Sequence, residues 1–176
     1  MTGARADNPR KRIPPMTDYR EKIMALDQLK GECARLKAEG KRIVFTNGCF
    51  DILHPGHTRY LYSARSLGDY LIVAVNSDRS VKVIKGKDRP VTPEQERAEL
   101  LAALGCVDGV VIFDEEDPLQ VIQHLVPHIL VKGGDWVEDE IIGAKVVKDA
   151  GGEVKRIPFE SGHSTTEILN KIKTLP

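Results

Sequence analysis

Two histidines stand three residues apart in the segment His54-Pro55-Gly56-His57, shortly after an apolar run and a polar loop. Imidazole side chains can donate hydrogen bonds, exchange protons or bind metals. Because proline suits the first position of a helix, we expect both histidines at a helix N-terminus. That end carries unpaired N–H groups and roughly half a positive charge, which attract anions. The spacing therefore predicts a phosphate-binding site.

Two simpler explanations compete with this interpretation. A pair of histidines at this spacing is also half of a metal site, but no further cluster of Cys, His or carboxylate residues follows at recognisable spacing. We therefore expect no metal bound directly by the protein. Gly48 and Gly56 could be ordinary turn residues. The combination of a strand, a glycine loop, the acidic Asp51 and two histidines at a helix start favours the phosphate site.

The elements that must position these histidines are one strand and one helix. The apolar residues 43–45 predict the strand. The loop Thr46-Asn47-Gly48-Cys49-Phe50-Asp51 leads from it to a helix that begins at Pro55. We expect Gly68 to close the last turn of this helix in a left-handed conformation.

The rest of the chain alternates between apolar runs and helical patterns. The continuous apolar run 70–75 is typical of a parallel strand covered on both faces. Thr92 is expected to cap the helix that starts at Pro93, with Gln95 as its capping-box partner. Further strands are predicted at 110–113, 129–131 and 154–157, and helices at 26–39, 93–104, from 118, at 141–150 and from 164. This alternation predicts a doubly wound, Rossmann-like α/β fold with a five-stranded parallel sheet in one domain, residues 16–176.

Polar residues follow three of the predicted strands. In open α/β sheets ligands bind beyond the carboxyl ends of the strands, so we expect these residues at one site. They are Thr46 and Asn47, then Asn76, Ser77 and Asp78, and then Lys132, Gly133, Gly134, Asp135 and Trp136. The paired glycines would let the backbone approach a ligand, and Trp136 could face a base or a sugar. Turn chemistry and core filling are the alternative explanation for this last segment.

Basic residues gather in the segment 80–89, which contains Lys82, Lys85, Lys87 and Arg89. In a chain without net charge, this segment is either a solvated basic loop or part of a phosphate site. Arg97 follows in the second turn of the next helix, where it could pair with Glu94 at the surface. We expect that replacing Lys82 or Arg97 lowers activity and barely changes stability.

Composition narrows the classes of protein and partner. The 176 residues are 41% hydrophobic, which suits one domain with a substantial core. The 26 basic and 26 acidic residues cancel, so neither nucleic acid nor an anionic membrane is an expected partner. The three cysteines are widely spaced, which suits a reducing cytoplasm better than a disulfide framework. Residues 1–15 are basic, proline-rich and nearly devoid of apolar side chains, and are expected to be a disordered tail.

The segment Gly48-Cys49-Phe50-Asp51-Ile52-Leu53-His54-Pro55-Gly56-His57 resembles the signature of the nucleotidyltransferase superfamily. From about residue 26 to 172 the chain resembles one branch, the adenylyltransferase half of bifunctional heptose kinase/adenylyltransferases. Residues 46–48, 74–78, 130–135 and 164–166 carry that resemblance. It implies transfer of AMP from ATP to D-glycero-β-D-manno-heptose 1-phosphate, which yields ADP-heptose for lipopolysaccharide. A separate heptose kinase would then supply the sugar phosphate.

The resemblance also implies roles for individual residues. His54, His57, Lys82 and Arg97 would be catalytic, with Arg97 presented to phosphate by its helix. The implied nucleotide ligands are Thr46, Asn47, Gly48, Phe50, Asp51, Gly56, Asn76, Asp78, Lys132, Gly133, Gly134, Asp135, Ser164, Thr165 and Thr166. The implied acceptor ligands are Lys85, Lys87, Arg89 and Trp136. Mg²⁺ is expected on the triphosphate of ATP, held largely by phosphate oxygens and water.

Residues 164–166 have a second explanation, because Ser164 and Glu167 match a capping box. The sequence also departs from related cytidylyltransferases, which have an arginine at the position of Phe159 and an apolar residue at that of His163. This difference favours ATP over CTP. Transfer to glycerol 3-phosphate, to pantetheine phosphate or to another phosphorylated acceptor stays open, as does a nucleotide-binding module without turnover. The oligomeric state, a homodimer included, is also open.

Overall fold

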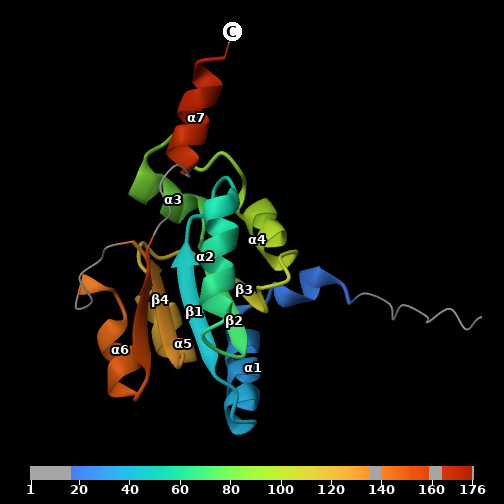
Figure 1. Ribbon diagram of the computed structural model, residues 1–176, viewed down its shortest axis with the longest axis vertical. Coiled ribbons are helices and arrows are strands. Elements are labelled where there is room, and N and C mark those ends of the chain that lie inside the picture. The colour runs from blue at the N-terminus through green and yellow to red at the C-terminus, as the bar shows by residue number, and fades with distance from the viewer. Residues whose placement is uncertain (1–16, 135–139, 159–163, 176) are drawn as a thin grey trace, which may run out of the picture.

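The computed structural model describes residues 17–134, 140–158 and 164–175, and it contains a five-stranded parallel sheet with helices on both faces (Figure 1). The strands are β1 (Ile43–Gly48), β2 (Tyr70–Asn76), β3 (Gly109–Phe113), β4 (Ile129–Gly133) and β5 (Glu153–Ile157). They lie in the order β3-β2-β1-β4-β5, and all four neighbouring pairs are parallel. The predicted doubly wound fold is confirmed, and its strand order reverses between β1 and β4. The predicted tail, residues 1–15, lies outside the described residues.

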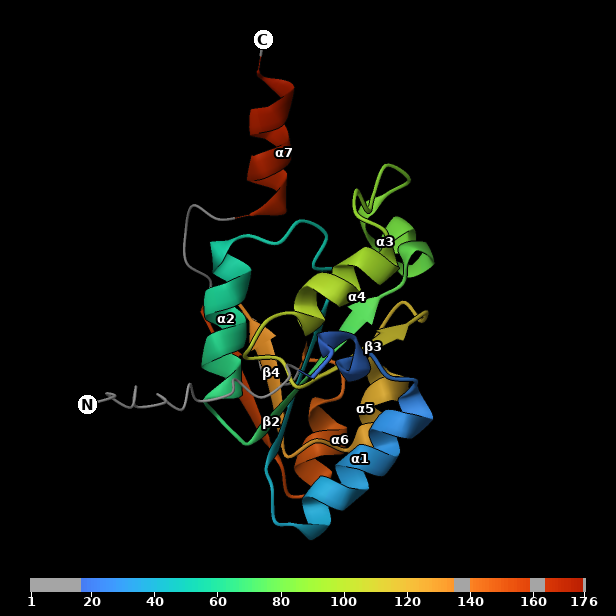
Figure 2. The same ribbon diagram turned by 90° about the vertical axis from the view of Figure 1, so that its right-hand side faces the viewer.

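Two hydrophobic clusters hold the helices against the two faces of the sheet. A short 3₁₀ helix, η1 (Tyr19–Lys22), precedes α1 (Leu26–Ala38), α2 (Pro55–Arg65), α3 (Asp78–Lys85), α4 (Glu94–Ala102), α5 (Leu119–Leu125), α6 (Ala144–Asp149) and α7 (Thr165–Lys173). One cluster joins Phe45 and Leu130 of the sheet to α1, α5 and α6. The other joins Val44 and Val131 to α2 and α4. Figure 2 shows the sheet between these two groups of helices.

The strand β2 shows why the sheet must be covered on both faces. Its residues from Leu71 to Asn76 are all buried, as the continuous apolar run predicts. Alternate side chains of a strand point to opposite faces, so Ile72 and Ala74 enter one cluster while Leu71, Val73 and Val75 enter the other. Because the strand is buried on both faces, polar residues that could bind a ligand gather where such strands end.

Several local predictions need correction. The segment predicted as a basic loop begins with the helix α3, because the Oγ of Ser77 accepts a hydrogen bond from the N–H of Ser80 and caps it. Gly68 is not left-handed, since α2 ends at Arg65 with Ser66 as its cap. A Cβ at Gly68 would lie 2.7 Å from the carbonyl oxygen of Arg42, so this glycine permits a close approach of two segments. The expected cap of α4 by Thr92 is absent, and Pro93 occupies the cap position.

The helix α7 stands beyond the carboxyl ends of the strands, above α2 (Figure 1). The Oγ of Ser164 accepts a hydrogen bond from the N–H of Glu167, which supports the predicted cap. The hydroxyl of Thr165 donates to the carbonyl of Ile52 at 3.4 Å. This contact brings the start of α7 to the loop that precedes α2. None of the described helices is long and apolar enough to span a membrane.

Candidate active site

His54 and His57 lie at the N-terminus of α2, where the sequence places them. His54 is the N-cap residue, Pro55 follows at the first helical position, and the His54 carbonyl accepts from the His57 N–H at 2.9 Å. The two imidazole rings stack, with centroids 3.9 Å apart and planes inclined by 22°. The ring of Phe50 lies 5.2 Å from that of His57. Both histidines thus stand together at a helix end that favours anions.

Burial keeps the His57 imidazole neutral. The pKa of His57 is lowered to about 4, chiefly by desolvation and also by the charge of His54, while a hydrogen bond with the Ile52 backbone opposes the shift. Its Nδ1 atom is buried and has no hydrogen-bond partner among the residues described. A neutral imidazole has one N–H donor, so at pH 7 His57 can donate to a phosphate without carrying a charge of its own.

The loop between β1 and α2 has a strained backbone. Phe50 is buried and adopts a left-handed conformation with φ of 47°. Such a conformation is uncommon for a bulky residue and is often found at functional sites. A Cβ at Gly48 would lie 3.0 Å from the Phe50 ring, so Gly48 leaves room for it. This strain could not be foreseen from residue types.

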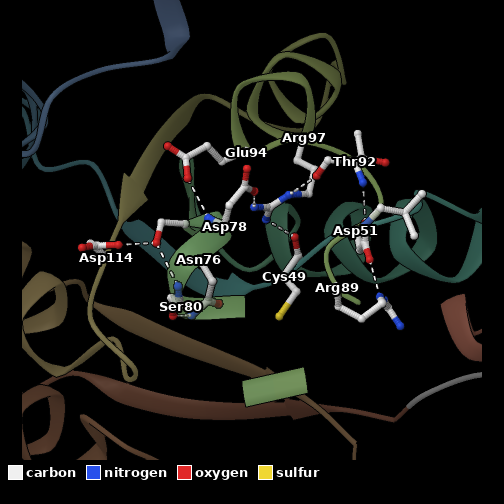
Figure 3. A network of polar contacts seen from close by, with 12 residues as sticks. Cys49, Asp51, Asn76, Asp78, Ser80, Arg89, Thr92, Glu94, Arg97 and Asp114 are labelled. Atoms are coloured by element: carbon white, nitrogen blue, oxygen red, sulfur yellow. Dashed lines mark hydrogen bonds and ion pairs between the residues drawn. The ribbon is translucent and has the colours of Figure 1, made fainter. Parts of the chain in front are cut away.

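Asp51 anchors the segment that leads to α4. Its side chain is 1% exposed, and its Oδ2 accepts from the Nε of Arg89 at 2.5 Å. Its Oδ1 accepts from the backbone N–H groups of Val91 and Thr92 at 2.8 and 2.9 Å (Figure 3). Asp51 and Arg89, expected to contact the nucleotide and the acceptor, therefore contact each other. Their ligand roles stay predictions.

Arg97 joins three segments and is fully buried. Its guanidinium donates to the Thr92 carbonyl at 2.8 Å, to the Cys49 carbonyl at 2.6 Å and to Oδ1 of Asp78 at 2.8 Å (Figure 3). It does not form the surface pair with Glu94 that the spacing allowed. The expectation that Arg97 can be replaced with little loss of stability is therefore corrected, while its predicted contact with phosphate remains untested.

A second polar network holds the start of α3 at the end of β2. Asn76 donates from Nδ2 to the Oγ of Ser80 at 2.9 Å, and Ser80 donates to the Glu115 carbonyl at 2.7 Å. Glu94 accepts from the backbone N–H of Asp78 at 2.7 Å (Figure 3). Sequence reasoning missed Ser80 and Glu94. Ser77 is a preferred N-cap residue and so indicates a helix start, but no local pattern indicates a role for Ser80 three positions later.

Cations surround the loop after β1. Burial raises the pKa of the Cys49 thiol, and the positive charges of Lys85, Arg97 and Arg89 oppose that shift. A thiol with a raised pKa is a poor nucleophile, so Cys49 does not suit covalent catalysis. Of the remaining predicted cations, Lys82 lies exposed on α3 and Lys87 in the turn after it.

The ends of β1 and β4 contribute another polar contact. The Nζ of Lys132 donates to the Oδ1 of Asn47 at 2.7 Å, and burial lowers the pKa of Lys132. Thr46 instead shares a 2.7 Å hydrogen bond with the hydroxyl of Tyr60 on α2. Gly133 ends β4, and Gly134 is left-handed with φ of 96°. Asp135, Trp136, Phe159 and His163 lie outside the described residues.

Comparison with known proteins supplies the family. A family model described as cytidylyltransferase-like matches residues 45–171, which include both histidines and the Ser/Thr segment 164–166. The chain belongs to the cytidylyltransferase-like family. Within the family it is 52% identical over 151 residues to the bifunctional protein HldE of Geobacter sulfurreducens, covering 86% of this chain and 31% of that protein. HldE of Proteus mirabilis is 56% identical over 151 residues, again 86% of this chain and 32% of the relative. The chain spans about a third of the length of these curated relatives.

Solved structures agree with the fold of this family member. A lipopolysaccharide core biosynthesis protein from Thermoplasma volcanium is 31% identical, with a TM-score of 0.55, over 69% of this chain and 98% of that one. A pantoate-beta-alanine ligase from Francisella tularensis, with beta-gamma ATP and beta-alanine bound, has a TM-score of 0.57 over 87% of this chain and 78% of its own. At 20% identity, the ligase supports the fold alone.

Proposed function

We propose that this chain transfers AMP from ATP to D-glycero-β-D-manno-heptose 1-phosphate, releasing pyrophosphate and forming ADP-heptose for the lipopolysaccharide core. The observation that carries the proposal is the stacked pair His54 and His57 at the N-terminus of α2. Membership of the cytidylyltransferase-like family supports nucleotidyl transfer. The similarity to HldE and to a lipopolysaccharide core biosynthesis protein supports the heptose branch that the motifs resemble.

The proposed reaction is a direct displacement at the α-phosphorus of ATP. An oxygen of the sugar phosphate forms a bond to that phosphorus, the bond to the β-phosphate oxygen breaks, and its electron pair leaves with pyrophosphate. A phosphate nucleophile is already an anion at neutral pH, so no general base is required. The protein then contributes alignment and stabilisation of charge.

The residues at the N-terminus of α2 would stabilise the leaving side of the transition state. His57, neutral because burial lowers its pKa to about 4, would donate a hydrogen bond to the triphosphate, and His54 would donate beside it. The backbone N–H groups at this helix end add donors that need no reorganisation. Lys82 on α3 would take up developing charge, and Ser164 and Thr165 would bring the start of α7 to the phosphates.

Mg²⁺ would enter with ATP and neutralise phosphate charge. Among the described residues, no group of three His, Cys, Asp or Glu side chains is placed to hold a metal ion. The two acidic residues nearest the β1 and β2 ends, Asp51 and Asp78, are paired with Arg89 and Arg97. We therefore propose that phosphate oxygens and water supply most of its ligands. A cytoplasmic location belongs to the same proposal.

A substrate panel scored by pyrophosphate release tests the function. ATP and CTP would each be offered with heptose 1-phosphate, glycerol 3-phosphate and pantetheine phosphate. We expect ATP with heptose 1-phosphate to turn over fastest. Equal or faster use of CTP would refute adenylyl transfer, and preference for another acceptor would refute the heptose assignment. ATP binding without pyrophosphate release on any acceptor would favour a non-catalytic module.

A further inference from the structure

The contact between Lys132 and Asn47 lies where the strand order reverses. Lys132 is in β4 and Asn47 in the neighbouring β1, and the Lys132 ammonium donates to the Asn47 amide oxygen at 2.7 Å. In doubly wound sheets this reversal is the usual place for ligands, beyond the carboxyl ends of the strands. Both residues occupy the ends of their strands.

The ammonium of Lys132 is partly desolvated and has no negative partner among the residues described. Its hydrogen-bond acceptor is a neutral amide. The buried Arg97 and the mostly buried Arg89 differ, because each contacts a carboxylate, Asp78 and Asp51 respectively. Removing a cation from water without a counter-charge costs free energy, and an apolar side chain of similar size would avoid that cost. The arrangement therefore suits a cation that receives its anion from a ligand.

Lys132 and Asn47 lie on the face of the sheet opposite to α2. Side chains two residues apart in a strand share a face. Phe45 and Leu130, two residues before Asn47 and Lys132, pack against α1, α5 and α6. Thr46, between Phe45 and Asn47, instead contacts Tyr60 of α2. The pair thus approaches the strand ends from the side that does not carry His54 and His57.

An in-line displacement needs protein groups on two opposite sides of the reacting phosphorus. The attacking and leaving oxygens stand roughly opposite each other across the reacting phosphorus. If the leaving pyrophosphate lies at the N-terminus of α2, the nucleophile enters from the other side. We propose that Lys132, held by Asn47, binds the phosphate of the acceptor, which is the incoming nucleophile, and does not bind the nucleotide. This inference rests on the proposed function and reassigns two residues that the sequence grouped with the nucleotide ligands.

The test compares Lys132→Met with Lys132→Arg and with the control Lys145→Met. Lys145 lies on α6 with its side chain 86% exposed, in an ion pair with Asp149. Three quantities are measured: the KM for heptose 1-phosphate at saturating ATP, the Kd of the α,β-methylene analogue of ATP without acceptor, and the melting temperature. Calorimetry adds the Kd of heptose 1-phosphate in the presence of the analogue.

For Lys132→Met we expect the acceptor KM and Kd to rise about tenfold to a hundredfold, the scale of one lost hydrogen bond to a charged group. The analogue Kd should change by less than about threefold, where a tenfold change in Kd corresponds to about 1.4 kcal/mol of binding free energy. The melting temperature should stay level or rise, because a desolvated charge is removed. Lys132→Arg should recover part of the acceptor affinity, and Lys145→Met should match the parent.

Two results would overturn the inference: an analogue Kd that rises as much as the acceptor Kd, or acceptor binding that is unchanged in Lys132→Met. Failure of the proposed function looks different, because the parent protein itself would then not turn over heptose 1-phosphate. In that case the calorimetry is repeated with the best acceptor of the panel, or with inorganic phosphate in the presence of the analogue. Equal phosphate binding by the parent and Lys132→Met would still refute the assignment.

Discussion

Replacing Arg97 by alanine should lower the unfolding free energy of this protein more than replacing Lys82, Lys132 or Lys145. The Arg97 side chain is fully buried and holds together the loop after β1, the segment before α4 and the start of α3. Its removal leaves the carbonyl groups of Thr92 and Cys49 and the carboxylate of Asp78 without their donor.

The expected loss of unfolding free energy depends on whether each of these groups can bind water in place of Arg97. A buried polar group that loses its partner costs about 1–3 kcal/mol. The two carbonyls approach that cost, whereas the Asp78 side chain is 35% exposed and can be rehydrated, so its share is smaller. The sum is roughly 3–5 kcal/mol of unfolding free energy, the scale of a broken buried ion pair. For a chain of this length that corresponds to a melting temperature lower by roughly 6–20 °C.

Thermal and urea unfolding of Arg97→Ala, beside the parent, measures the effect. Arg79→Ala is the matched control, because Arg79 also pairs with a carboxylate, that of Asp114, but both side chains are more than half exposed at 67% and 58%. The control should melt close to the parent, because exposed ion pairs contribute little to stability. If Arg97→Ala melts within about 2 °C of the parent, less than about 1 kcal/mol is lost and the assigned network does not hold the three segments.

Three further predictions concern the phosphate site. His57→Ala should lower turnover about a hundredfold or more and His57→Asn should recover only part of it, with ATP affinity falling less than turnover; turnover above half the parental rate in a variant that melts like the parent would exclude the catalytic role. Because the folded pKa of His57, about 4, lies below the unfolded value of about 6.5, the unfolded chain binds more protons between these values. The contribution of His57 to the unfolding free energy should therefore be constant above pH 6.5 and fall by up to roughly 1.4 kcal/mol per pH unit towards pH 4. Between pH 7 and pH 5 the urea midpoint of His57→Asn should therefore fall less than that of the parent. Lys82→Ala should lower catalytic efficiency about tenfold to a thousandfold without changing the melting temperature, since Lys82 is exposed; near-normal turnover would show that it belongs to a solvated surface only.

The features that residue types and local spacing determined are those with short-range causes. The buried strand β2 follows from its continuous apolar run, and the number and order of alternating elements imply a doubly wound parallel sheet. The place of His54 at the start of α2 follows from Pro55, because proline fits only the first helical turn without loss. The motif around these histidines also indicated the family to which the chain belongs.

Only the tertiary structure decided how the polar residues pair. Asp51 and Arg89 are 38 residues apart, and Arg97 meets Cys49 across 48 residues, so no local pattern could join them. Burial, and with it the lowered pKa of His57, depends on how α2 packs on the sheet. The face on which Lys132 lies depends on the parallel pairing of β4 with β1, which brings its ammonium to Asn47 from 85 residues away. Residue types and their spacing in the sequence identify the charged groups near a site. Three-dimensional packing determines which of these groups neutralise one another and which remain to bind a ligand.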